Sequence, residues 1–144
     1  METQFVVGCD IAQDSFTFCL RSQFQVIAEG LVLNNAKAIR TWLNTLKKTY
    51  GAEGMQQILF VMEHTGIYSS FLLQALHERS IPVCVESAVK IKYSQGMTRG
   101  KNDKIDAQRI AEYGVRNGDH IPQSVGSLNE LCWYGFSSFR LPTL

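Results

Sequence analysis

The chain has 144 residues, enough for one domain, and its 45% hydrophobic and 19% charged residues exclude a disordered protein. A formal net charge of +1 excludes a protein that is basic throughout but leaves local basic segments open. Without an apolar run of about 18 residues or a readable secretory signal, we expect a cytoplasmic protein with no membrane partner, and the widely spaced cysteines predict reduced thiols.

Three short strands are predicted at the beginning of the chain. Gln4–Asp10 is an apolar run that ends in a carboxylate, which is typical of a buried strand. Phe16–Leu20 and Gln25–Leu33 are the next two apolar segments, and turn residues separate all three. This pattern predicts an antiparallel meander.

The apolar period then changes to that of a helix. Apolar residues recur at helical spacing within 39–50, Asn34 or Asn35 is a natural N-cap, and Gly51 is expected to end the helix. Ile58–Glu63 follows as a continuous apolar run that again ends in a carboxylate. It therefore predicts a second buried strand of the same kind as the first.

The remaining elements alternate. Thr65 is expected to cap a helix that carries Phe71 and Leu72, Ile81–Val85 is a further strand, and a last helix begins near Asp103. The order β-β-β-α-β-α-β-α predicts an α/β protein with a mixed sheet and helices on its faces. This is the order of the ribonuclease H-like fold, although periodicity alone also allows other α/β sheets.

Basic residues are concentrated in one segment. Residues 1–89 carry a net charge of −2, whereas residues 90–116 carry +4. Because the phosphate backbone attracts Lys and Arg irrespective of sequence, this segment is a candidate nucleic-acid contact, with a solvated loop as the alternative. Tyr68, a turn after Glu63, is a further candidate for a nucleic-acid contact, but packing in the core is the expectation for it. The candidate contacts are Lys90, Lys92, Arg99, Lys101, Lys104 and Arg109.

Four acids stand out by position. Asp10 and Glu63 end predicted strands, and Asp103 and Asp106 are spaced to share one face of the last helix. Clustered carboxylates repel one another unless a cation such as Mg²⁺ or Mn²⁺ offsets their charge, and such ions can clamp both oxygens of a phosphodiester displacement. The four acids are therefore candidate catalytic and metal-binding residues. Ordinary strand ends and helix capping explain each acid singly, so both interpretations stay open.

Three segments also carry a family resemblance. Val6–Phe16, Val61–Tyr68 and Arg99–Ala111 resemble, in this order, the N-terminal domain of the DEDD insertion-sequence transposases of the IS-one-ten family. The Piv pilin-gene invertase is a relative of these proteins. The resemblance runs from about Phe5 to Pro122.

The resemblance implies a RuvC-like domain of ribonuclease H-like fold over residues 1–122. Proteins of that family bind divalent metal through four acids and cleave and rejoin DNA strands during transposition or inversion. The implied partners are the element ends and target DNA, in some members a structured RNA made from the element, and, for the full-length family, further copies of the chain. The implied location is the bacterial cytoplasm, in association with DNA. The family's four acidic positions fall here on Asp10, Glu63, Asp103 and Asp106.

Residues 123–144 depart from the family pattern. Cys132–Leu144 is rich in aromatic residues where the family continues into a long charged helix. We therefore hypothesise a frameshift or decay of the element near Leu131, which would leave a truncated and inactive fragment. The family's nucleophilic serine belongs to a separate C-terminal domain, and no serine in this tail can be matched to it.

One alternative function shares the fold. An actin-like or sugar-kinase type of ATPase domain also has an aspartate at the end of its first strand. That class needs a glycine-rich phosphate hairpin between the first strands, which the segment 12–15 does not supply.

Overall fold

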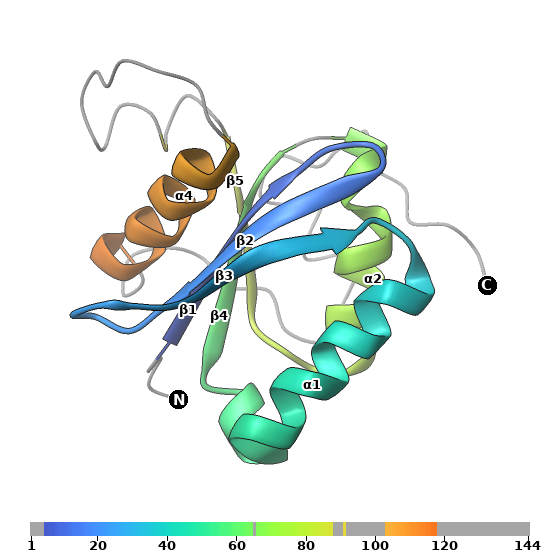
Figure 1. Ribbon diagram of the computed structural model, residues 1–144, viewed down its shortest axis with the longest axis horizontal. Coiled ribbons are helices and arrows are strands. Elements are labelled where there is room, and N and C mark those ends of the chain that lie inside the picture. Colours follow the sequence, from blue (N-terminus) through green and yellow to red (C-terminus); the bar gives the residue numbers. More distant parts are fainter. Residues whose placement is uncertain (1–4, 65, 88–90, 92–102, 118–144) are drawn as a thin grey trace.

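A computed structural model describes residues 5–64, 66–87, 91 and 103–117. Within them, five strands form one mixed sheet in the order β3-β2-β1-β4-β5, with α4 on one face and α1 and α2 on the other (Figure 1). The predicted α/β class and element order are confirmed. The elements are β1 (Phe5–Ile11), β2 (Ser15–Arg21), β3 (Val26–Leu33), α1 (Ala36–Met55), β4 (Ile58–Glu63), the 3₁₀ helix η1 (Gly66–Ser69), α2 (Ser70–Glu78), β5 (Val83–Glu86) and α4 (Asp103–Asn117).

The sheet combines two kinds of pairing. β1, β2 and β3 pair antiparallel, which confirms the predicted meander. β4 pairs parallel with β1 on one side and with β5 on the other. The carboxyl ends of β1, β4 and β5 therefore lie at the same edge of the sheet.

Helices cover both faces of the central strands, which explains their continuous apolar sequence. On the face covered by α1 and α2, Val7 of β1 and Phe60 of β4 belong to the larger apolar layer. On the face covered by α4, Val6 and Val61 pack with Ala107 in a smaller layer. Successive residues of each strand thus alternate between two buried layers.

Helix α1 begins at the predicted N-cap and continues across a kink at Gly51. Asn35 is the N-cap, and its side-chain oxygen accepts a hydrogen bond from the Ala38 N–H at 2.8 Å. Gly51 leaves helical geometry with φ 77° and ψ 168°, but the helix resumes beyond it and reaches Met55. Gly51 therefore ends the first helical stretch, as predicted, and a second short stretch follows the kink and ends at the buried Met55.

The other predicted details vary in outcome. Thr65, the expected cap of the second helix, lies outside the described residues; Ser69 occupies the N-cap position of α2. Cys9, Cys19 and Cys84 are buried thiols that form no disulfide bond, as predicted for reduced cysteines, and burial raises the pKa of Cys19 to about 11. Cys132 falls outside the described part. Among the helices described, none has the length and apolar character needed to cross a membrane.

Candidate active site at the carboxyl edge of the sheet

Asp10 and Glu63 occupy adjacent positions on adjacent parallel strands. The register of β1 and β4 places Cys9 opposite Met62, and Asp10 and Glu63 are the next residues of the two strands. Both side chains are half-buried. The two strands that end in Asp10 and Glu63 are therefore adjacent in the sheet, as expected.

The same two acids share a face of the sheet. Side chains alternate along a strand, so Asp10 lies on the same face as Val6, and Glu63 on the same face as Val61. Val6 and Val61 both belong to the apolar layer under α4. Asp10 and Glu63 therefore lie on the α4 face, at the point where the apolar layer ends.

Two glycines fix how α4 crosses that face. A Cβ atom on Gly8 would collide with the backbone of Ala107 and Ala111, and a Cβ on Gly114 would come within 2.7 Å of the Val6 side chain. Since Val6 precedes Gly8 in β1, α4 runs antiparallel to β1. Its first turn, which contains Asp106, accordingly lies toward the carboxyl edge beside Asp10.

The electrostatics agree with this placement. Burial and, secondarily, the negative charge of Asp106 raise the pKa of Glu63. The Asp106 carboxylate lies 3.6 Å from the Arg109 guanidinium, one turn further along α4. The structure thus brings Glu63 and Asp106 within electrostatic range, with Asp10 beside Glu63, whereas the Asp103 side chain lies outside the described residues although its backbone begins α4.

The carboxylates suit a hard cation, but the described side chains do not form a complete coordination shell. Within the described ranges, no three His, Cys, Asp or Glu side chains are grouped closely enough to hold a metal ion. Mg²⁺ is commonly held by one or two carboxylates, with water and phosphate oxygens completing its shell. The donor set at Asp10 and Glu63 therefore fits a cation that is bound together with a phosphate.

A buried amide holds the two strand ends together. The Asn34 side chain donates hydrogen bonds of 2.9 Å to the carbonyl oxygens of Ala12, just after β1, and of Tyr68, in η1 just after β4. Asn34 is only 8% exposed. The sequence indicated Asn34 only as a possible helix cap. Its bonds to Ala12 and Tyr68 were not predictable because both residues are distant from Asn34 along the chain.

Glu86 is a third acid at the end of a strand, and the sequence pattern did not single it out. Glu86 ends β5 and lies directly opposite Glu63 in the parallel register. The predicted strand Ile81–Val85 stopped one residue short of it. The available signal was the one that identified Asp10 and Glu63, an apolar run that ends in an acid.

Most of the predicted nucleic-acid contacts cannot be placed. Lys90, Lys92, Arg99 and Lys101 lie outside the described residues, as does the side chain of Lys104. Arg109 is described: its side chain is 24% exposed and is ion-paired with Asp106. The one basic side chain of this set that can be placed thus lies at the carboxylates.

Exposed apolar side chains follow Glu63 along the chain. Ile67 is 71% exposed, Tyr68 40% and Phe71 42%. The expectation that Tyr68 packs in the core was wrong. Gly66, with φ 65°, begins η1 three residues after Glu63. The backbone carbonyl of Tyr68, not its ring, is bonded to the buried Asn34 side chain.

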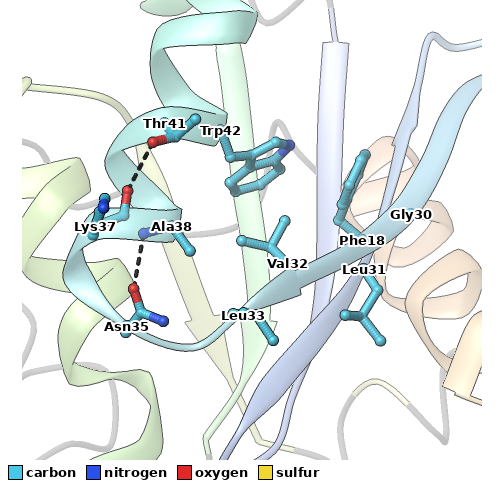
Figure 2. A pocket seen from close by; sticks show the side chains of 10 residues that line it. All are labelled: Phe18, Gly30, Leu31, Val32, Leu33, Asn35, Lys37, Ala38, Thr41 and Trp42. Carbon is cyan, nitrogen blue, oxygen red and sulfur yellow. Dashed lines mark hydrogen bonds between the residues drawn. The ribbon is translucent and has the colours of Figure 1, made fainter.

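A groove of about 500 Å³ lies elsewhere, between the edge strand β3 and α1 (Figure 2). The Trp42 and Phe18 rings lie 4.9 Å apart, centre to centre, at its inner side. Trp42 packs against the layer under α1 and α2, opposite the carboxylates. No acidic side chain is among its described lining residues: Phe18, Gly30, Leu31, Val32, Leu33, Asn35, Lys37, Ala38, Thr41 and Trp42.

Comparisons with known proteins point to a family and a fold. Residues 7–131 match the model of the IS110 (IS-one-ten) DEDD family, described as transposase. The RuvC protein of T. thermophilus in complex with a Holliday junction substrate is similar with a TM-score of 0.64 and 9% identity over 84% of this chain and 99% of that one. A second Thermus thermophilus RuvC structure is similar with a TM-score of 0.57 and 12% identity over 83% of this chain and 99% of that one. None of the curated proteins compared matches the sequence.

Proposed function

The chain belongs to the IS110 family of DEDD transposases, and we propose that this domain binds DNA and takes part in divalent-metal-dependent cleavage and rejoining of phosphodiester bonds. The observation that carries the proposal is the convergence of Asp10, Glu63 and the first turn of α4 at one edge of a RuvC-like sheet. Carboxylates gathered at strand ends, with a helix that brings another acid, suit a site for a cation and a phosphate.

The acids would share the work of holding the cation. Asp10 and Glu63 would bind Mg²⁺ or Mn²⁺ from the sheet, and Asp106, together with Asp103, would bind from α4. When bound, such an ion polarises the phosphodiester and offsets negative charge as the bond breaks. Glu63 has a raised pKa because burial and Asp106 both disfavour its charge, so a cation at this place would relieve a cost that the apo protein bears.

The surroundings supply contacts for the rest of the nucleic acid. Arg109, which is ion-paired with Asp106, would meet a phosphate that approaches the acids, and the basic segment 90–104 would extend that contact along the backbone. The exposed ring of Tyr68 could stack on an unpaired base, since base–aromatic stacking tolerates any sequence. The RuvC neighbour complexed with a Holliday junction makes branched DNA the first substrate to test.

The test is binding of a labelled four-way DNA junction and of a linear duplex with the same sequence, followed by fluorescence anisotropy with Mg²⁺, with Mn²⁺ and with chelator. We expect metal to strengthen binding of the junction, and Asp10→Asn to remove that gain. Asp14→Asn, which changes an exposed aspartate in the turn after β1, is the matched control and should keep it. A junction affinity that changes neither with metal nor in Asp10→Asn would contradict the proposal. Binding of ATP in calorimetry would favour the ATPase alternative.

A further inference from the structure

Glu63 and Glu86 are neighbours with different surroundings. They face each other in the register of β4 and β5. Glu86 follows Cys84 by two residues, and Cys84 packs in the layer under α4, so both glutamates lie on the α4 face. Glu63 lies within range of the charge of Asp106, whereas Glu86 is engaged by hydrogen bonds.

The hydrogen bonds of Glu86 join three elements. Its carboxylate accepts from the Tyr113 hydroxyl at 3.2 Å and from the Ser87 N–H at 3.1 Å. Its backbone carbonyl accepts from the His64 N–H, the residue after Glu63, at 3.0 Å. Glu86 thus holds the end of β4 through its backbone and α4 through its side chain.

Tyr113 is well suited to transmit this tie along α4. It is 6% exposed, and burial with the neighbouring Glu86 charge raises its pKa to about 12, so its hydroxyl remains a donor at neutral pH. Asp106 lies seven residues earlier, which is about two helical turns and returns to nearly the same face. A bond that holds Tyr113 therefore also fixes the rotation and the axial position of Asp106.

The helix has a second tie at the opposite side of the sheet. The Gln108 side chain donates a 2.8 Å hydrogen bond to the Glu29 carboxylate on β3. β3 and β5 are the two outer strands, so these side-chain bonds hold α4 at both sides of the sheet. With the Gln108 bond intact, loss of the Tyr113 hydroxyl is expected to shift α4 slightly and leave the fold in place.

We propose that Glu86 and Tyr113 form a positioning pair that sets the place of Asp106 relative to Glu63. Glu86 then acts through α4 and does not itself bind the cation. The proposal rests on the proposed function for its consequence, metal affinity, but the geometry it predicts can be measured without metal.

The first measurement is Mn²⁺ affinity by titration calorimetry, with thermal unfolding of the same variants in chelator. Tyr113→Phe and Glu86→Ala should each weaken Mn²⁺ binding about tenfold. The double variant should bind Mn²⁺ no more weakly than either single variant, since both substitutions remove the same hydrogen bond. Glu86→Gln, which keeps an oxygen that can accept from Tyr113, should retain affinity. Tyr50→Phe, a partly buried tyrosine of α1 on the other face, is the control and should change nothing.

The second measurement is the backbone amide resonances of Glu63 and Asp106 in the metal-free protein. Tyr113→Phe should shift both, and Glu86→Gln should shift them much less. If Glu86→Gln loses affinity as Glu63→Gln does, Glu86 is a ligand and the proposal is overturned. Unchanged affinity and unchanged resonances in Tyr113→Phe would also overturn it. A wild-type chain that binds no Mn²⁺ contradicts the proposed function instead, while the resonances still decide whether the pair positions α4.

Discussion

Glu63, at the end of β4, has its pKa raised by burial and by the negative charge of Asp106 in the first turn of α4. A strand and a helix that are distant in sequence therefore place like charges near each other at one edge of the sheet. This arrangement costs stability in the apo protein, because neither burial nor a neighbouring carboxylate favours ionised Glu63. A cation would turn the same arrangement into a gain, which is the physical basis of the proposed site.

Neutralising Glu63 should affect stability in opposite ways with and without metal. In chelator, Glu63→Gln should raise the melting temperature at pH 7, because it removes a charge that the fold disfavours. With Mg²⁺ or Mn²⁺ the wild type should gain by mass action, whereas the variant should gain little. Thermal unfolding in both buffers checks this reversal in the order of the two melting temperatures. Glu78→Gln, at an exposed position in α2, should melt like the wild type in both buffers.

The same glutamate should give the wild type a characteristic pH dependence in chelator. The raised pKa means that the folded chain holds this proton more tightly than the unfolded chain. The contribution of Glu63 to the free energy of unfolding should therefore fall as pH rises from about 4.3, the ordinary glutamate value, through the raised pKa. Denaturant unfolding across this range should show a shallower decline in Glu63→Gln; parallel curves for the two proteins would contradict the assignment.

Gly8 should tolerate no side chain. Gly8→Ala places a methyl group against the backbone of Ala107 and Ala111, which cannot move without lifting α4 from the sheet. We expect the free energy of unfolding to fall by about 2–3 kcal/mol, and metal affinity to fall as well. Gly30→Ala meets only the Phe18 ring, which can turn, and should cost less. Equal losses in the two variants would show that α4 is not held as closely as described.

Asn34 and Asn35 are adjacent but should have separable effects. Asn34→Ala removes the bonds to the Ala12 and Tyr68 carbonyls, which should cost about 1–3 kcal/mol and weaken Mn²⁺ binding by loosening the ends of β1 and β4. Asn35→Ala removes only the cap of α1, at about 1 kcal/mol, and should leave Mn²⁺ binding unchanged. Denaturant unfolding with Mn²⁺ calorimetry on both variants separates the roles, and an equal loss of affinity would count against the Asn34 tie.

Arg109 should contribute to DNA binding more than a second arginine of the same helix. Arg109→Gln should weaken junction binding and lower the slope of log affinity against log salt by about 1, as expected for one lost phosphate contact. Arg116, paired with Glu112 near the other end of α4, is the control, and Arg116→Gln should leave the slope unchanged. Anisotropy titrations at several salt concentrations measure both; identical slopes for Arg109→Gln and the wild type would rule out the contact.

Much of the fold could be read from apolar periodicity because the central strands are buried on both faces. Ile58–Glu63 was predicted at its observed bounds, and each end of the first three strands was predicted to within one residue. Gly51 breaks the helical geometry as predicted, whereas the second short helical stretch beyond it, which ends at the buried Met55, was not predicted.

The site was less visible because it depends on long-range contacts. Position at strand ends drew attention to Asp10 and Glu63, but Glu86 was missed by one residue at the strand boundary. The bonds of Asn34 and Tyr113 join segments that are distant in the chain, and no local pattern signals them. The domain boundary near residue 122 stays a prediction.

The central claim is that the acids at the carboxyl edge bind a divalent cation, and titration calorimetry of Mn²⁺ tests it most directly. The wild type and the two matched controls, Asp14→Asn and Glu78→Gln, should bind Mn²⁺ with equal affinity. Asp10→Asn and Glu63→Gln should each bind it at least about tenfold more weakly, because each removes a charged ligand. Affinities that are unchanged in Asp10→Asn and Glu63→Gln would contradict the account.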